Sequence, residues 1–272
     1  YELQDAIGVM GEFLEHGTRN QILTMSYFNR TLEWDAFTGV TAKKAVMQFS
    51  SDPEMIAAFM PTYLSSAERY VSYALGGSQS GNGDERQYRP IPIGWLFDSR
   101  GEAIAHYGVL KDILESMKKK VLEFAPCVFP WYRVELTRGQ LIKRMCVIAY
   151  SLGDSGLIEE AAGNVMEIDI SGSYESRAKW VELLLHSPEN EHQKELLLSF
   201  LADKETMTRK TAFRLAEGLE LSDGDYRQIE AFLKYKKGDI RQNVLKLLEK
   251  QSDKGLEESV RRLLSSSSEE MR

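Results

Sequence analysis

A stripe of apolar positions recurs in the second half of the chain at a period of 32 residues. The segments that begin at Arg177, Arg209 and Arg241 read RAKWVELLL, RKTAFRLAE and RQNVLKLLE, and the third, fourth, sixth and seventh residues after each arginine are apolar. These offsets place the apolar side chains on one face of a helix. A related segment, RMCVIAYSL, begins 33 residues earlier, at Arg144. The pattern predicts four related helices.

Partner helices are predicted between and after these copies. Three segments share an apolar pattern at the same offset, the last with a slip of one residue: Ser187–Leu201, Ser222–Lys234 and Leu256–Leu264. Ser187 followed by Pro188 is typical of an N-cap and first turn, and Ser222 with Asp225 resembles a capping box. One such pair of helices cannot cover its own apolar stripe, so neighbouring pairs must stack and share a continuous core.

A family resemblance agrees with this stacking. Two sets of residues resemble the second helix of HEAT repeats, which carries an Asp, an Arg and small or aliphatic residues: Asp203, Arg209, Ala212 and Leu215, then Asp239, Arg241, Val244 and Leu247. The resemblance to HEAT and armadillo repeats covers roughly residues 138–265. It implies an all-α fold with an α-α superhelix, a solenoid, in the C-terminal half.

The first half is expected to be helical but less regular. Helical spacing is found in the segments Glu2–Glu15, Arg19–Phe28, Ala42–Phe49, 52–60, 62–75 and 101–124. Pro53 follows Asp52 as a residue of the first turn follows its cap, and Pro61 is expected to end that helix, because proline lacks a backbone donor. Residues 76–94, rich in Gly, Ser and Pro, are predicted to form a long flexible loop.

Two domains are therefore expected. Residues 1–125 form the irregular helical region with the loop 76–94, and residues 126–272 form the HEAT-like repeats after a proline-containing connector. The tail from 265 to 272 is expected to fray.

Composition favours a protein of the cytoplasm. The chain has 272 residues, 43% of them hydrophobic, and contains only Cys127 and Cys146, too few for a disulfide framework or a zinc cluster. No stretch approaches the roughly 18 apolar residues of a membrane span, and no signal peptide precedes the first helix. Because the chain begins at Tyr1, we expect a segment of a larger bacterial protein.

The arginines Arg144, Arg177, Arg209 and Arg241 form the most regular polar feature. Guanidinium groups at this spacing could bind phosphates or an acidic partner. The interpretation that we favour is structural, in which they bridge acidic groups of the same or the next repeat. Exposed neighbouring positions would then form the binding face.

No catalytic or metal-binding pattern is predicted. Two of the four histidines, His16 and His192, follow glutamates, an order opposite to the His-Glu pairs of HEAT-like iron hydroxylases, and neither cysteine has a histidine near it in sequence. The glycines of 76–94 lack the strand and the Gly-Lys-Ser/Thr of a phosphate-binding loop. We therefore expect no enzyme activity and no cofactor.

The leading hypothesis is a non-catalytic scaffold that binds a protein partner through the exposed side of the repeat helices. The predicted contact residues are Lys179, Glu182, Lys210, Arg214, Glu217, Lys246 and Glu249. The alternative is a HEAT-like protein of nucleic-acid binding or DNA repair, for which the basic runs at 118–120 and 234–237 are the only support. The net charge of −7 disfavours it. The partner's identity and the oligomeric state stay open.

Overall fold

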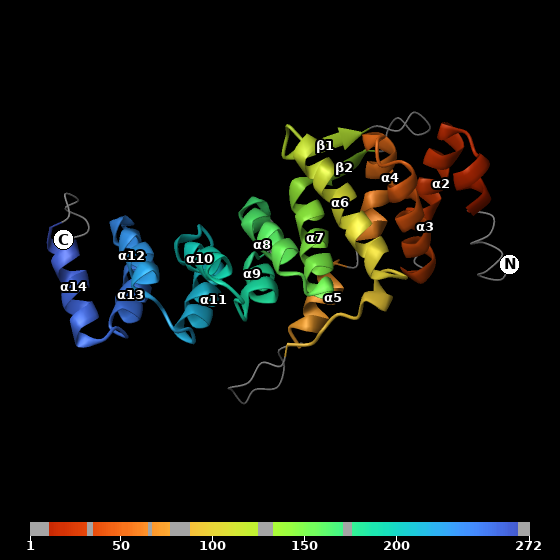
Figure 1. Ribbon diagram of the computed structural model, residues 1–272. Helices are drawn as coiled ribbons and strands as arrows, with labels where there is room; N and C mark the ends of the chain where they lie inside the picture. The colour runs from red at the N-terminus through yellow and green to blue at the C-terminus, as the bar shows by residue number, and fades with distance from the viewer. Residues whose placement is uncertain are drawn as a thin grey trace. The chain divides into compact units, whose positions relative to one another are not determined.

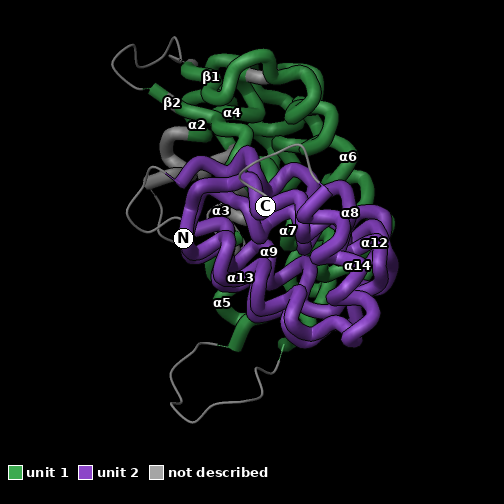
Figure 2. The backbone as a smooth tube through the Cα atoms, turned by 90° about the vertical axis from the view of Figure 1, so that its left-hand side faces the viewer, with its two compact units in different colours: residues 1–153 green, residues 154–272 purple. Residues whose placement is uncertain are grey.

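The computed structural model describes residues 11–31, 35–64, 67–76, 88–124, 133–170 and 176–265. Most of these residues are helical, in agreement with the expected fold class (Figure 1). By their contacts they divide into two compact units, residues 1–153 and 154–272 (Figure 2). The predicted boundary lay at 125/126. It falls later because helix α7 (Arg138–Leu152) packs against α6, α5 and α4 of the first unit.

Unit 1 is a set of helices packed against one another, with one small sheet. Its other helices are α2 (Arg19–Thr31), α3 (Asp35–Gln48), α4 (Pro53–Leu64), α5 (Ala67–Ala74), the 3-10 turn η1 (Ile93–Trp95) and α6 (Arg100–Ser116). Helices α2 and α3 pack on α4, and α6 packs on α7. The core includes Phe59, Phe97, Leu110 and Met145, all fully buried.

The ends of several unit 1 helices follow from side-chain capping. The Asp52 carboxylate accepts hydrogen bonds from the backbone N–H groups of Glu54 (3.1 Å) and Met55 (3.2 Å), so α4 begins at Pro53 as predicted. Thr137 and Gln140 form a capping box at the start of α7. These bonds satisfy amides that the helix itself leaves without acceptors.

Two predictions for unit 1 are wrong. Helix α4 continues through Pro61 to Leu64, because the proline lies in the last turn, where few bonds of the helix remain to be lost. The helix predicted over 101–124 ends at Ser116, since Met117 adopts an extended conformation (φ −73°, ψ 104°). Residues 121–124 then form a strand.

That strand, β1 (Val121–Phe124), pairs antiparallel with β2 (Val134–Thr137). The register places Leu122 opposite Leu136, and Leu136 is fully buried. This sheet was not predicted, because each strand has only four residues.

The predicted flexible loop is described only in its last part, since 77–87 lie outside the described residues. The described part packs on α7. Ile91 is buried, its carbonyl accepts a bond from Ser151 Oγ (2.8 Å), and the carbonyl of Arg89 accepts one from Tyr150 Oη (3.1 Å). The prediction of flexibility is therefore wrong for residues 88–94. The tail from 266 onward also lies outside the described part of the chain.

Unit 2 consists of short helices in two layers (Figure 1). One layer holds α8 (Ser155–Asn164), α10 (Glu191–Ser199), α12 (Asp223–Glu230) and α14 (Asp253–Leu264). The other holds α9 (Ala178–Leu185), α11 (Thr206–Glu217) and α13 (Gly238–Leu248). Within each layer every helix packs against the next, and α10 and α12 also pack on α11 and α13. Short 3-10 turns, η2 (Val165–Glu167), η3 (Phe200–Ala202) and η4 (Ala231–Lys234), follow α8, α10 and α12.

The apolar stripe of the sequence forms the core between these layers. Trp180, Ala212 and Val244 are fully buried at equivalent positions of α9, α11 and α13. The capping box of Ser222 and Asp225 is confirmed at the start of α12. The start predicted at Ser187 is wrong, because Asn190 is the N-cap of α10, with its side chain accepting from Gln193 N–H at 3.0 Å.

Polar contacts tie each repeat to the next at a separation close to one period. Arg214 pairs with Glu182 (2.8 Å) and Arg262 pairs with Glu230 (2.6 Å), each across 32 residues. Gln228 Nε2 donates to the carbonyl of Glu195 across 33 residues. The period seen in the sequence is thus the step at which neighbouring helices meet.

Candidate functional site

The candidate site is the outer side of α11 and α13, which we call the α11/α13 face. Each helix directs its apolar stripe inward; Ala212, Ala216, Val244 and Leu248 are buried. The opposite side is therefore left to solvent, as expected of an amphipathic helix. The face comprises equivalent residues 32 positions apart: Phe213 and Leu245, Arg214 and Lys246, Glu217 and Glu249.

The side chains of this face differ in how firmly they are held. Arg214 donates to the buried carboxylate of Glu182, yet 41% of its side chain stays exposed. The Lys246 ammonium lies 5.8 Å from the centre of the Phe213 ring, within the range of a cation–π contact. Glu182 thus fixes the orientation of a guanidinium that still has donors available on its outer side.

Other charged residues lie beside the face. Lys250 donates to the carbonyl of Glu217 (2.7 Å), and its ammonium is 3.7 Å from the Glu217 carboxylate. Lys210 is exposed one turn before Arg214. Within the described residues, no acidic group forms an ion pair with Lys210.

Two of the seven predicted contact residues are not exposed. Glu182 is 4% exposed, and Lys179 is half-buried with its ammonium 5.6 Å from the Trp180 ring. The reason is that α9 is covered where α11 and α13 are not, as Val181 and Leu185 are fully buried. Exposure is found for the other five predicted residues: Lys210, Arg214, Glu217, Lys246 and Glu249.

Sequence reasoning missed the apolar part of the face. Leu245 is 50% exposed, although it stands in the stripe column of Val181, which is fully buried. A stripe predicts inward positions for all copies, whereas exposure depends on which neighbour covers each copy. The 32-residue alignment of Val181, Phe213 and Leu245 was the signal available.

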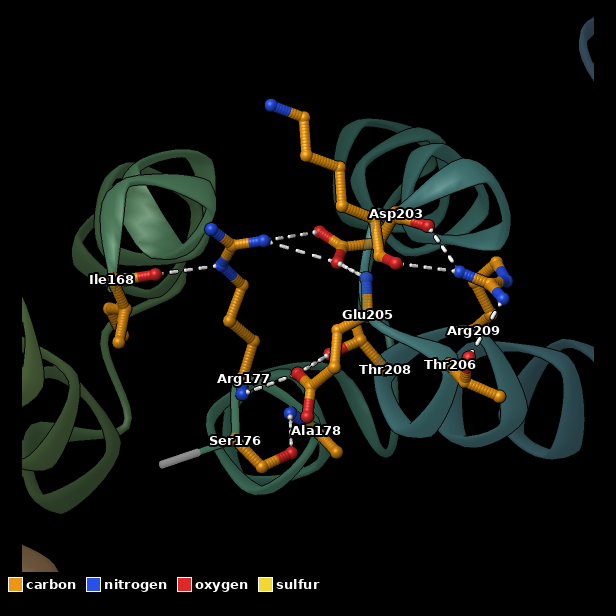
Figure 3. Close-up of polar contacts among 10 residues, drawn as sticks. Ile168, Ser176, Arg177, Ala178, Asp203, Glu205, Thr206, Thr208 and Arg209 are labelled. Atoms are coloured by element: carbon orange, nitrogen blue, oxygen red, sulfur yellow. Dashed lines mark hydrogen bonds and ion pairs between the residues drawn. The ribbon is translucent and has the colours of Figure 1, made fainter. Parts of the chain in front are cut away.

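Arg177 and Arg209 are structural, as we expected. The Arg177 guanidinium donates to both carboxylate oxygens of Asp203 (3.1 and 3.2 Å) and to the carbonyl of Ile168 (2.9 Å), as Figure 3 shows. Arg209 donates to the carbonyls of Asp203 (2.8 Å) and Lys204 (2.9 Å). It also pairs with Asp239 and lowers the pKa of that carboxyl group.

The remaining two arginines are held differently. Arg241 Nε donates to the carbonyl of Leu233 (3.0 Å). Arg144 lies in unit 1, buried, with its guanidinium 4.6 Å from the Tyr63 ring centre and 5.7 Å from that of Phe97. The four arginines therefore do not form one ligand-binding row.

The histidines and cysteines do not assemble a catalytic or metal-binding group in the described part of the chain, which holds no cluster of three or more candidate ligands. His16 and His192 are exposed and lie near Glu15 and Glu195, at 3.9 and 3.7 Å. Cys146 is buried, and burial raises the pKa of its thiol. Cys127 lies outside the described residues.

His106 is the one titratable side chain of unit 1 with a strongly shifted pKa among the described histidines. Its Nδ1 is 3.0 Å from Tyr63 Oη, and its Nε2 is 3.7 Å from a Glu102 oxygen. Burial, and then the positive charges of Arg144 and Lys43, lower the pKa of His106 to about 4. The imidazole is therefore neutral at pH 7, which suits a packed core residue.

The basic runs are exposed but lie in turns. Lys118, Lys119 and Lys120 occupy the bend between α6 and β1, and 234–237 lead from η4 into α13. None of the helices in the described residues is both long and apolar enough to cross a membrane.

Comparisons with other proteins add one finding. The sequence profile of one protein family matches the chain over residues 1–272, and that family is described as a family of unknown function, DUF5724. No curated protein and no solved structure is significantly similar to the chain.

Proposed function

The chain, over residues 1–272, belongs to the family of unknown function DUF5724, and from this premise we propose that it is a non-catalytic, HEAT-like helical-repeat scaffold. In this proposal the second unit is a short α-α superhelix, and the α11/α13 face binds a protein partner.

The two-layer packing of unit 2 supports the superhelix. Each helix contacts the next member of its own layer, and ion pairs such as Arg214–Glu182 link residues one period apart. Repeat proteins are built in this way, with each unit contacting only its neighbours. Such a stack holds surface residues at fixed spacings, which favours recognition of an extended partner.

The observation that carries the binding proposal is the composition of the exposed face. Most surface charges on helices are merely solvated. Here an exposed leucine, Leu245, lies beside Lys246, and the guanidinium of Arg214 is oriented by a carboxylate buried at a cost in desolvation. Arginines and exposed apolar side chains that are held in place in the free protein are typical of binding surfaces.

Nucleic acid is a weaker candidate for the same face. A phosphate backbone would be repelled by Glu217 and Glu249, which stand three residues after Arg214 and Lys246 on the same two helices.

The test is affinity capture from cell extract with the chain as bait, followed by mass spectrometry. Wild type is compared with the triple variant Lys210→Glu, Lys246→Glu, Glu249→Lys. We expect a specific protein to be captured by the wild type, to survive nuclease treatment, and to be lost with the variant.

A matched control lies in the other layer. The variant Glu195→Lys, Arg227→Glu, Lys254→Glu changes exposed residues of α10, α12 and α14 and alters the net charge by the same amount. It should retain the captured protein. Equal capture by all three baits, each folded by circular dichroism, would exclude this face; capture that disappears after nuclease treatment would favour nucleic acid.

A further inference from the structure

The α11/α13 face has the same order of side chains on both helices. Along α11, Phe213, Arg214 and Glu217 lie within about 100° of one another around the helix axis, by the geometry of 3.6 residues per turn. Leu245, Lys246 and Glu249 occupy the same places on α13. In each helix the cation precedes the glutamate by about 4.5 Å along the axis. The face therefore carries an apolar, a basic and an acidic position in each repeat.

The step between the two repeats fits an α-helical partner. Packed helices lie about 8–10 Å apart, and α11 and α13 are direct neighbours, with the Lys246 ammonium 5.8 Å from the Phe213 ring. Seven residues of an α-helix span about 10.5 Å and return to the same side of that helix. A helix that crosses both repeats thus presents equivalent residues to each of them, one heptad apart.

An extended segment fits less well. At about 3.3 Å per residue, a strand covers the same step in three residues, and residues three apart point to opposite sides of a strand. The second contact would then face away from the protein. A nucleic-acid backbone meets the two glutamates described above.

We propose that the α11/α13 face binds an amphipathic α-helix of a partner protein, with heptad-spaced apolar residues on Phe213 and Leu245. Its acidic flank pairs with Arg214 and Lys246, and its basic flank with Glu217 and Glu249. This inference rests on the proposed function and names the partner's structure. The face ends at α9, where Val181 is buried, so two heptads make the contact.

The probes are two synthetic helical peptides of identical composition, roughly 21 residues each, long enough to form a helix. Both carry leucines at heptad positions. In the uniform peptide all glutamates lie on one flank and all lysines on the other. In the crossed peptide the middle heptad exchanges the two charges. Binding is measured by fluorescence anisotropy at concentrations where the peptides are monomeric.

The matched protein variant is Lys246→Glu, Glu249→Lys, which keeps the net charge and crosses the rows of the face. Wild type should bind the uniform peptide about tenfold more tightly than the crossed one, a difference of about 1.4 kcal/mol. The variant should show the reverse preference. Because a peptide can bind in either direction, only the agreement between successive heptads matters, and this design tests that agreement.

Leu245→Ser supplies a second reading, because loss of the apolar contact should weaken both peptides equally. Reciprocal preference supports the inference. The same preference in wild type and variant, or no binding of either peptide by the wild type, overturns it. If the cellular partner is still lost on charge reversal while neither peptide binds, the proposed function stands and the helical partner does not. Competition of the uniform peptide by a DNA duplex would assign the face to phosphate recognition instead.

Discussion

Buried cations are held in two different ways at the scale of single residues. Arg177 and Arg209 are surrounded by carboxylate and carbonyl oxygens, which satisfy the fork of donors that lysine lacks. Arg144 lies among the rings of Tyr63 and Phe97. The same residue type, aligned in the sequence, thus serves ion pairing in unit 2 and ring packing in unit 1.

The Arg177–Asp203 pair gives a stability prediction. Arg177→Met should lower the free energy of unfolding by about 3–5 kcal/mol, because it leaves the Asp203 carboxylate buried without its partner. Adding Asp203→Asn should restore part of this loss, since the buried charge is then removed. Urea unfolding of the two variants checks this, and equal stabilities would contradict it.

His106 predicts a dependence of unit 1 stability on pH. Its folded pKa of about 4 lies below the usual value of 6.5, so the unfolded chain takes up the proton first as the pH falls. The contribution is complete above pH 6.5 and is lost, by about 3 kcal/mol, as the pH falls toward 4. Urea unfolding across this range should show a shallower pH dependence for His106→Gln.

The exposed His192 provides the control for that measurement. His192→Gln should keep the wild-type pH dependence, because its side chain is 61% exposed. A His106→Gln slope equal to that of the wild type would mean that other groups govern acid unfolding.

At the scale of helices and strands, the ends are set by single caps, and glycine has opposite effects at two of them. Gly153, after α7, has a φ of 58°, a conformation that strains any residue with a side chain. Gly163 lies inside α8, and a methyl group added there would meet no atom within 4 Å.

We therefore expect substitutions of opposite sign. Gly153→Ala should destabilise by about 1 kcal/mol, and Gly163→Ala should stabilise by about 0.5–1 kcal/mol, through the higher helix propensity of alanine. Thermal unfolding of both variants gives the comparison. A loss of stability at Gly163 would show that the end of α8 needs the freedom of glycine.

Helices were predictable from sequence where pattern and cap coincided. The inward stripe of Trp180, Ala212 and Val244 and the capping box at Ser222 both hold. The strand at 121–124 was not predictable, because its partner strand stabilises it from another part of the chain. Exposure of the candidate site was only partly predictable, as Glu182 is hidden where its equivalents Arg214 and Lys246 are not.

At the scale of the whole molecule, the second unit is unevenly packed along its length. Seven residues of α9 are buried, whereas α14 buries only Ser259 and leaves Val260 and Leu264 exposed at 46% and 64%. In a stack of repeats each unit is stabilised by its neighbours, so the unit with fewer contacts opens more often.

Hydrogen exchange should therefore follow a gradient along unit 2. We expect amides of α14 to exchange fastest, those of α13 at an intermediate rate, and those of α9 slowest, as measured by mass spectrometry of peptic fragments. Protection of α14 equal to that of α9 would indicate a single cooperative block.

The ion pairs that join residues 32 positions apart also limit how such a chain can change its length. Removal of one whole period between α9 and α13 would bring Lys246 to the place of Arg214, opposite Glu182, and a cation would still meet the buried carboxylate. Removal of a single residue would turn every later side chain by about 100° around its helix and part these charges. Unequal recombination between copies is thus tolerated in steps of a full repeat, whereas single-codon deletions inside these helices are not.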